Sequence, residues 1–296
     1  MLRRLWAAIG LVLAAGLAGA FSPAPDAPPG AAVTDSEGAE VKVSALKFGT
    51  GTRRLAWLAD PGGATEDARK GPLAVEIREP HSTTFKQGIV TYVPVESVES
   101  IKYDYERKVA LVAVKGLTEP LAGTLEYQGL NVFVFGGTVD GKAATFSGGA
   151  FKKGNIKAVA FPEAKPVGAK KGQAPWLVQI DQPKALDPTL KGSHFQFLYQ
   201  FPNGSEVLTD AAAVRKGEPL KLDELKALTP LAVDLNNHTA AVEVLAGDGT
   251  EKVLILPPME KDGKKGVLVG LLAEVDAGWK LFPLHTIKVM KRPKKD

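Results

Sequence analysis

The stretch GGTVDGKA at 136–143 fits G-x-x-x-x-G-K, the beginning of a phosphate-binding P-loop. In that motif a glycine-rich loop surrounds phosphates, and a Ser or Thr at the start of the next helix binds magnesium. Position 143 is alanine, and AATFSGGAF, which follows, is β-branched, aromatic and interrupted by glycine, which disfavours a helix. Asp140-Gly141 is typical of a tight hairpin turn, so the stretch predicts a hairpin and no nucleotide site.

Other catalytic patterns are equally incomplete. No two of the four histidines, His81, His194, His238 and His285, have the i, i+2 or i, i+4 spacing of a local zinc site. The absence of cysteine excludes thiol nucleophiles and disulfides. No G-x-S-x-G occurs, and GTGTRR at 49–54 begins like a dinucleotide-binding loop but ends in arginine. We therefore expect a protein without cofactor or metal, and the balance favours a non-enzymatic role.

One connection is a candidate partner-binding loop. EPHSTTFKQG at 79–88 joins two predicted strands, and connections of this kind face solvent. Phe85 would be the apolar anchor, and His81, titrating near neutrality, would make the contact depend on pH. The alternative is a hydrogen-bonded turn with Phe85 folded back onto the protein. The candidate residues are His81, Ser82, Thr83, Thr84, Phe85 and Lys86.

The net charge of +4 comes from the ends and the linker of the chain. Arg3 and Arg4, the segment at 162–175 and KVMKRPKKD at the C-terminus carry more than this charge together, so the remaining parts are acidic. This distribution argues against a nucleic-acid-binding face. The basic tail is either a solvated terminus or an electrostatic contact with an anionic membrane or polymer. Its residues are Lys291, Arg292, Lys294 and Lys295.

The N-terminus predicts export. MLRR precedes an apolar run from Leu5 to Leu17, and AGA follows at 18–20, which is typical of a Sec-type signal peptide cleaved near Ala20. The alternative is an uncleaved anchor, although the run is shorter than the ~20 apolar residues of a spanning helix. No later run is long enough to span. We expect a secreted or periplasmic protein of a bacterial envelope.

Composition divides the chain into two domains. Proline, glycine and lysine gather between apolar runs, as in spacers and linkers. The predicted organisation is a signal peptide at 1–20, a proline-rich spacer at 21–32, a first domain at 33–161, a linker at 162–175, a second domain at 176–290 and a basic tail at 291–296.

Both predicted domains have the period-2 pattern of strands. In FQFLYQF, Phe195, Phe197, Tyr199 and Phe201 share one face, which is either core or a stacking platform. The fold class is therefore all-β, with two small antiparallel barrels or sandwiches. Other predicted strands are EVKVSAL, LAVEIRE, GIVTYV, VALVAV, NVFVF, NIKAVAF, TAAVEV, EKVLIL, GVLVGLL and HTIKVM.

The two halves also match each other. PVESVESI at 94–101 and LKLDELKAL at 220–228 predict helices of one or two turns, and each precedes a strand. Aligning these strands places Asp104 on Asp234, and NIKAVAF matches HTIKVM at nearly the same separation. These matches predict an internal duplication, with chance similarity of two all-β domains as the alternative.

The order of GIVTYV, helical turn, IKYD, hairpin and VALVAV is similar to small SH3-like or Sm-like barrels. TTFKQGIVTYVPVESVESIKYD also resembles uncharacterised secreted β-rich proteins of planctomycete bacteria, a resemblance that covers the first domain and implies no activity. We expect a non-enzymatic binding or assembly protein whose partner is a protein or an envelope polymer. The alternatives are a hydrolase that cleaves an envelope polymer through Asp and Glu carboxylates, and a structural module of a larger assembly.

Overall fold

The computed structural model describes residues 22–23, 30–59, 71–79, 88–125, 133–149, 155–167, 176–180, 189–234 and 239–293. The predicted signal peptide, the candidate loop at 81–86, His238, Lys294 and Lys295 lie outside these residues. Within the described ranges the fold is all-β and its strand pairs are antiparallel, which confirms the predicted class. The same ranges contain no helix with the length and apolar character needed to cross a membrane.

The chain forms two compact units. Unit 1 comprises Met1–Arg53, Leu73–Ile77 and Val93–Val167, and unit 2 comprises Arg54–Pro72, Arg78–Tyr92 and Gly168–Asp296. The break after Val167 falls inside the predicted linker, 162–175. Arg54–Pro72 and Arg78–Tyr92 belong to unit 2 although they lie within the sequence range of the predicted first domain. These ranges carry helix α2 (Ala56–Ala59) and parts of β4 (Thr52–Arg54), β5 (Leu73–Arg78) and β6 (Val90–Pro94).

Unit 1 contains one sheet whose strands follow the order β11-β10-β3-β2-β12-β7-β8-β9, with the two-residue β1 (Ser22–Pro23) paired to β3. A 3-10 helix, η3 (Val95–Ser97), leads into β7. The strands in chain order are β2 (Gly30–Asp35), β3 (Glu40–Phe48), β7 (Val98–Asp104), β8 (Val109–Val114), β9 (Leu121–Gly123), β10 (Phe133–Val139), β11 (Lys142–Gly148) and β12 (Ile156–Ala160).

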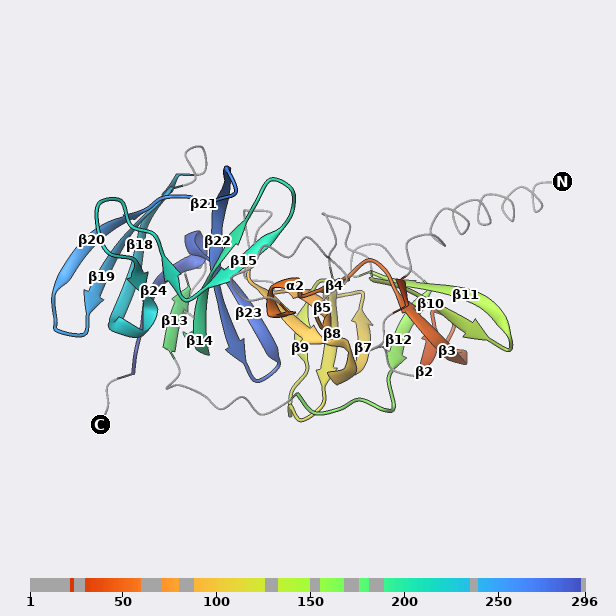
Figure 1. The fold of residues 1–296 in the computed structure, drawn as a ribbon. Coiled ribbons are helices and arrows are strands. Elements are labelled where there is room, and N and C mark those ends of the chain that lie inside the picture. The colour runs from red at the N-terminus through yellow and green to blue at the C-terminus, as the bar shows by residue number, and fades with distance from the viewer. Residues whose placement is uncertain are drawn as a thin grey trace. The chain divides into compact units, whose positions relative to one another are not determined.

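Unit 2 has the order β20-β19-β18-β24-β13-β14-β22-β23-β6, and Figure 1 shows β20, β19, β18, β24, β13 and β14 side by side. Short strands β15 (Glu206–Thr209) and β21 (Met259–Lys261) attach to β14 and β22, and β16 (Ala211–Ala212) pairs with β17 (Leu220–Lys221). The longer strands are β13 (Trp176–Ile180), β14 (Thr189–Gln200), β18 (Leu225–Asp234), β19 (Thr239–Ala246), β20 (Glu251–Leu256), β22 (Lys264–Val275), β23 (Gly278–Pro283) and β24 (Ile287–Lys291).

The two units repeat one strand plan. Reading unit 1 from β11 to β9 and unit 2 from β23 to β20 gives the same sequence of neighbours, and the corresponding strands also follow the same chain order. The 3-10 helix η4 (Leu222–Glu224) precedes β18 as η3 precedes β7. A shared order over eight strands is more than two arbitrary all-β domains require. We therefore describe the units as two repeats.

The strand registers agree as well. Ile101 pairs with both Val112 and Val159, and the equivalent Leu228 pairs with both Val244 and Met290. Three β-bulges fall at equivalent places. These are Val98/Ser100 and Leu225/Ala227, Ile156/Ala158 and Ile287/Val289, and Gly136/Thr138 and Leu272/Glu274. Because bulges are local features that persist through evolution of a fold, their coincidence supports the predicted duplication.

The alignment of Asp104 with Asp234 is wrong. Tyr103 pairs with Ala110, and Pro230 pairs with Val242, so Pro230 is the residue equivalent to Tyr103. Strand β18 then continues beyond the equivalent end of β7 through a further bulge at Pro230/Ala232. The helical turns are also shorter than predicted, because both η3 and η4 are single 3-10 turns before the chain enters a strand.

The buried sides of the strands form the core of each unit. In unit 2, β14 pairs with β13 through its first half and with β15 through its second half, so it belongs to two sheets over one core. Phe195, Phe197, Tyr199 and Phe201 are all buried, so the aromatic stripe is core. The predicted architectures are barrels or sandwiches. The strand orders do not return to their first strand within the described residues, so a closed barrel is not formed there.

The stretch GGTVDGKA lies at the turn between β10 and β11. Val139 pairs with Lys142, and Asp140 and Gly141 between them have φ of 48° and 78°. Two consecutive positive φ values define the type I′ turn that matches strand twist. The stretch is a hairpin, as predicted, and Asp262-Gly263 forms a turn with the same signs of φ.

Candidate functional site

The base of the predicted binding loop is well fixed, although residues 81–86 themselves lie outside the described part of the chain. The Glu79 backbone N–H donates to the Ile89 carbonyl at 3.0 Å. The Glu79 carboxylate lies 2.5 Å from the Lys280 ammonium, and both side chains are nearly buried, at 12% and 13% exposure. The Thr91 hydroxyl donates to the same carboxylate at 2.8 Å. Glu79 therefore anchors one side of the loop's base to β6 and β23.

The predicted basic tail begins inside the fold. Lys291 is the last residue of β24 and pairs with Leu177 and Ala227, with its side chain exposed. Arg292 is held by three contacts: its backbone N–H donates to the Lys226 carbonyl, its guanidinium donates to the Asp223 carbonyl, and its Cζ lies 5.0 Å from the centre of the Trp176 ring. Arg292 thus has a structural position on unit 2.

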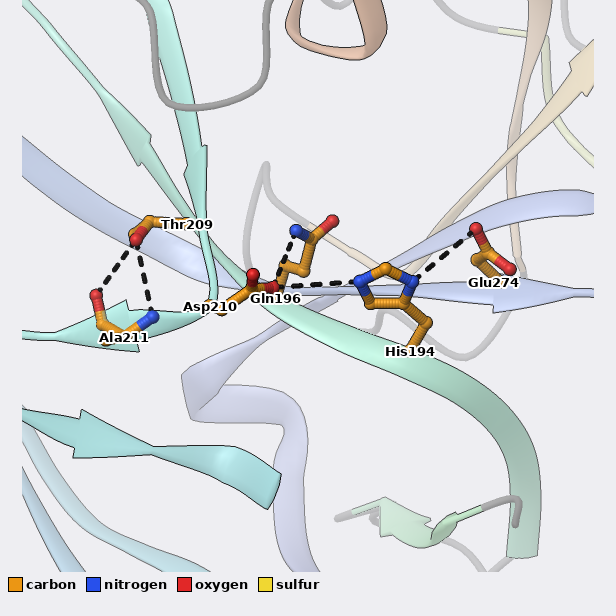
Figure 2. Close-up of polar contacts among 6 residues, drawn as sticks. All are labelled: His194, Gln196, Thr209, Asp210, Ala211 and Glu274. Carbon is orange, nitrogen blue, oxygen red and sulfur yellow. Dashed lines mark hydrogen bonds and ion pairs between the residues drawn. The ribbon is translucent and has the colours of Figure 1, made fainter. Parts of the chain in front are cut away.

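A polar cluster surrounds His194 in unit 2. Its Nε2 lies 3.6 Å from Asp210 Oδ1, and its Nδ1 lies 3.9 Å from Glu274 Oε1. Gln196 donates to the same Asp210 oxygen at 2.8 Å. Figure 2 shows the imidazole between the two carboxylates, which come from β22 and from the connection between β15 and β16. Both distances from the imidazole exceed hydrogen-bonding range, and Asp210 is 77% exposed, so these contacts are weak in water.

The backbone of His194 does not mark a functional site. His194 has φ of 48° in a bulge where His194 and Phe195 lie opposite Ala273. Ala45 has φ of 49° in the equivalent bulge of unit 1, where it and Leu46 lie opposite Gly137. Because alanine adopts the same unfavourable conformation, the conformation belongs to the fold of the repeat, and only the His194 side chain is specific to unit 2.

A hollow of about 820 Å³ lies elsewhere in unit 2. Its volume is in the range of small-molecule sites. The charged lining residues are two cations and two anions, and Lys265 lies 3.9 Å from Glu260. This lining favours no single ligand charge. The residues are Ala213, Arg215, Asp234, Thr239, Pro257, Pro258, Glu260 and Lys265.

The most distinctive surface of unit 2 is the outer side of its large sheet. Directly paired residues of adjacent strands point to the same side of a sheet. One row of paired residues therefore crosses six strands, from β14 through β13, β24, β18 and β19 to β20. It consists of Lys191, Leu177, Lys291, Ala227, Leu245 and Glu251. None of the six is buried, whereas Val178, Leu228, Val244 and Met290 on the opposite side are buried in the core.

Further apolar residues extend this surface on β18 and β20. The second row is Thr229, Glu243 and Val253, and the third is Ala232, Ala241 and Ile255, beside Leu231 in the bulge. Val253 and Leu231 are 61% and 53% exposed, and they are the large hydrophobic residues with the greatest exposure among those described. We call these three rows with Leu231 the second-repeat outer face.

Charge divides the second-repeat outer face. Lys191 and Lys291 lie on β14 and β24, whereas Glu243 and Glu251 lie on β19 and β20. Within the described ranges, none of these four side chains forms an ion pair. The face is thus basic on β14 and β24 and acidic on β19 and β20, and apolar residues lie on β13, β18, β19 and β20.

The first repeat provides an internal comparison. Its equivalent row is Lys42, Ala32, Ala160, Ser100 and Ala113, and Ala122 occupies the position of Val253. These six positions carry small residues and a single charge in unit 1, whereas Lys102 and Leu111 occupy the positions of Thr229 and Glu243 in the second row. The strand plan therefore does not require the larger apolar side chains of Leu177, Leu245 and Val253, since unit 1 has alanine at their positions.

Sequence reasoning missed this face because its residues come from six strands that are far apart in the chain. The alternation in TAAVEV does place Ala241 and Glu243 on one side, but it does not reveal which side is solvated or what lies beside it. Strand register decides both. Among the described residues, no group of three or more His, Cys, Asp or Glu side chains is placed to hold a metal ion.

No protein-family model, curated protein or solved structure matches the chain.

Proposed function

We propose that the protein is an exported, non-enzymatic binding or assembly protein of the bacterial envelope and that it binds its partner through the second-repeat outer face. The observation that carries this proposal is the exposure of Val253, at 61%, where the first repeat has Ala122. A large apolar side chain on solvent gains little hydrophobic stabilisation from folding, whereas its burial at an interface is favourable. Export itself rests on the N-terminal sequence.

The composition of the face supports binding more than catalysis. Protein interfaces combine apolar residues with a polar rim, and this face has Leu231 and Leu245 between its charged ends and Val253 beside Glu251 on β20. Catalysis of polymer hydrolysis would instead need two carboxylates at a cleft that holds the substrate. Asp210 and Glu274 flank His194 away from the hollow of unit 2. Asp234 and Glu260 do line the hollow, but Arg215 and Lys265 line it as well, and Lys265 lies 3.9 Å from Glu260. The hydrolase alternative therefore has less support.

A crosslinked pull-down from the envelope fraction of the native host tests the proposal. The bait is the mature chain, compared with Val253→Asp and with Ala122→Asp as the matched control at the equivalent exposed position. We expect Val253→Asp to reduce recovery of the crosslinked partner at least tenfold and Ala122→Asp to leave it unchanged. Equal recovery with all three baits would contradict the proposal. Circular dichroism melting establishes that each variant is folded.

A further inference from the structure

We infer that the second-repeat outer face binds a second copy of this chain, face to face, about a two-fold axis parallel to the strands. The inference rests on the proposed function, since it identifies the partner at the same surface. Symmetry is the reason for choosing this partner. A two-fold interface brings one surface against itself, so that surface must be complementary to itself.

The six-residue row meets that requirement. Rotation about an axis parallel to the strands reverses the order of strands across the interface, so the basic end of one copy lies over the acidic end of the other. Lys191 then faces Glu251 of the partner subunit, and Leu177 faces Leu245 of the partner subunit. The same rotation places Lys291 beside Ala227 of the partner subunit, with its stem on the apolar centre. Each row thereby supplies an ion pair at both ends and apolar contact between them.

The unpaired state of the four charges agrees with this arrangement. Lys191, Lys291, Glu243 and Glu251 form no ion pairs with other described residues, so their charges are available to the partner subunit. A partner with a uniform charge, such as an anionic polymer, would meet repulsion at one end of the row. A second copy meets attraction at both ends.

The size of the face sets the strength of the dimer. The first row spans six strands, about 24 Å at a spacing of ~4.8 Å, whereas the second and third rows cover three strands each, about 10 Å. With about 7 Å between rows along the strands, the face buries about 300 to 400 Å² per copy, or about 600 to 800 Å² in total, which is below the area of stable complexes. We expect a dimer that dissociates at micromolar concentration, strengthens as salt is lowered and forms where the protein is locally concentrated.

Charge-reversal variants, measured by analytical ultracentrifugation, test the face-to-face arrangement. The mature chain is measured between 5 and 500 µM in low salt, and we expect a reversible monomer–dimer equilibrium that weakens in high salt. Lys191→Glu and Glu251→Lys should each weaken dimerisation about tenfold. A mixture of these two variants should form a heterodimer, because the two ion pairs across its axis are again of opposite charge. Lys102→Glu, an exposed residue of unit 1, is the matched control and should have no effect.

Two results would overturn the inference. One is a mature chain that stays monomeric at 500 µM in low salt. The other is a dimer that neither Lys191→Glu nor Glu251→Lys weakens, or whose two variants do not associate when mixed. If the chain is monomeric and Val253→Asp still abolishes recovery of an envelope protein in the pull-down, a second copy is the wrong partner and the proposed binding face stands. If the chain is monomeric and Val253→Asp changes nothing, both proposals fail.

Discussion

Ala45 and His194 occupy the same position in the two repeats, and both have a left-handed backbone, with φ of 49° and 48°. Each is the first of two residues that lie opposite one residue in a bulge between equivalent strands. Left-handed conformations cost most residues about 1 kcal/mol or more. The repeat has kept this conformation with different side chains, so the bulge is needed by the strand plan.

Glycine at Ala45 should therefore stabilise the protein. Removing the side chain relieves the left-handed strain, partly offset by the greater freedom of glycine in the unfolded chain, so we expect Ala45→Gly to raise the free energy of unfolding by about 0.5 kcal/mol. Urea denaturation measures the change. Ala113→Gly, in a strand without positive φ, is the control and should lower the free energy by about 0.5 to 1 kcal/mol. A loss of stability in Ala45→Gly would contradict the assignment of strain.

The buried pair of Glu79 and Lys280 should be strongly coupled. Removing one partner leaves the other charge nearly buried, so Glu79→Gln or Lys280→Met alone should lower the free energy of unfolding by about 3 kcal/mol. The double variant should lose less than the sum of the single losses. A thermodynamic cycle from urea denaturation measures the coupling. Additive losses would show that the two side chains do not act as a pair.

Tyr103 should make stability fall in alkaline solution. Burial, and secondarily the neighbouring Tyr105, raises the pKa of Tyr103 well above its ordinary value near 10. Above pH 10 the unfolded chain releases the phenolic proton while the folded chain keeps it. The contribution of Tyr103 to the free energy of unfolding is therefore complete at neutral pH and decreases as the pH rises above 10. The decrease is about 1.4 kcal/mol per pH unit above 10.

Comparison with Tyr103→Phe isolates this contribution. Tyr199 is also buried with a raised pKa, so the variant should retain part of the alkaline loss. We expect the free energy of unfolding to fall less steeply between pH 10 and pH 11.5 in Tyr103→Phe than in the native chain, as measured by denaturation at each pH. Parallel curves would show that Tyr103 ionises normally in the folded protein.

Close backbone packing in the centre of unit 2 depends on Gly270. A Cβ at this position would lie 2.3 Å from the Phe282 carbonyl oxygen and 2.8 Å from Pro283 Cα, which cannot move without shifting β23. Gly270→Ala should therefore lower the melting temperature by several degrees, corresponding to about 1 to 3 kcal/mol. Gly217→Ala is the control, since its nearest neighbour would be a Val214 side-chain atom at 3.4 Å. Equal melting temperatures for the two variants would contradict this packing.

Local signals in the sequence predicted local structure well. Asp140-Gly141 predicted a hairpin because two consecutive positive φ values favour those residues. The alternation in FQFLYQF predicted that its aromatic residues share one face, and the structure shows that this face is core. The helical turns were overestimated because Val95, Val98 and Ile101 recur every third residue, a spacing that a single 3-10 turn followed by a bulged strand also produces. The duplication was visible in sequence, but its register was not, since β18 is longer than β7.

The candidate site could not be predicted in the same way. Lys191 and Glu251 belong to one row only because four intervening strands are paired in a particular register. A shift of one residue in any of those pairs would turn the side chains to the core. Conversely, the loop at 81–86 and the residues Lys294 and Lys295 were chosen from local composition, and their roles in binding remain predictions.

The most direct test of the account is lysine footprinting by acylation and mass spectrometry. The protein is labelled in the envelope fraction of its host and, separately, after purification and dilution to nanomolar concentration. If the second-repeat outer face is a binding surface, Lys191 and Lys291 should react at least several-fold more slowly in the envelope fraction, whereas Lys42 and Lys102 on the equivalent side of unit 1 should react equally in both. Equal reactivity of Lys191 and Lys291 in the two samples would show that no partner covers the second-repeat outer face in the envelope.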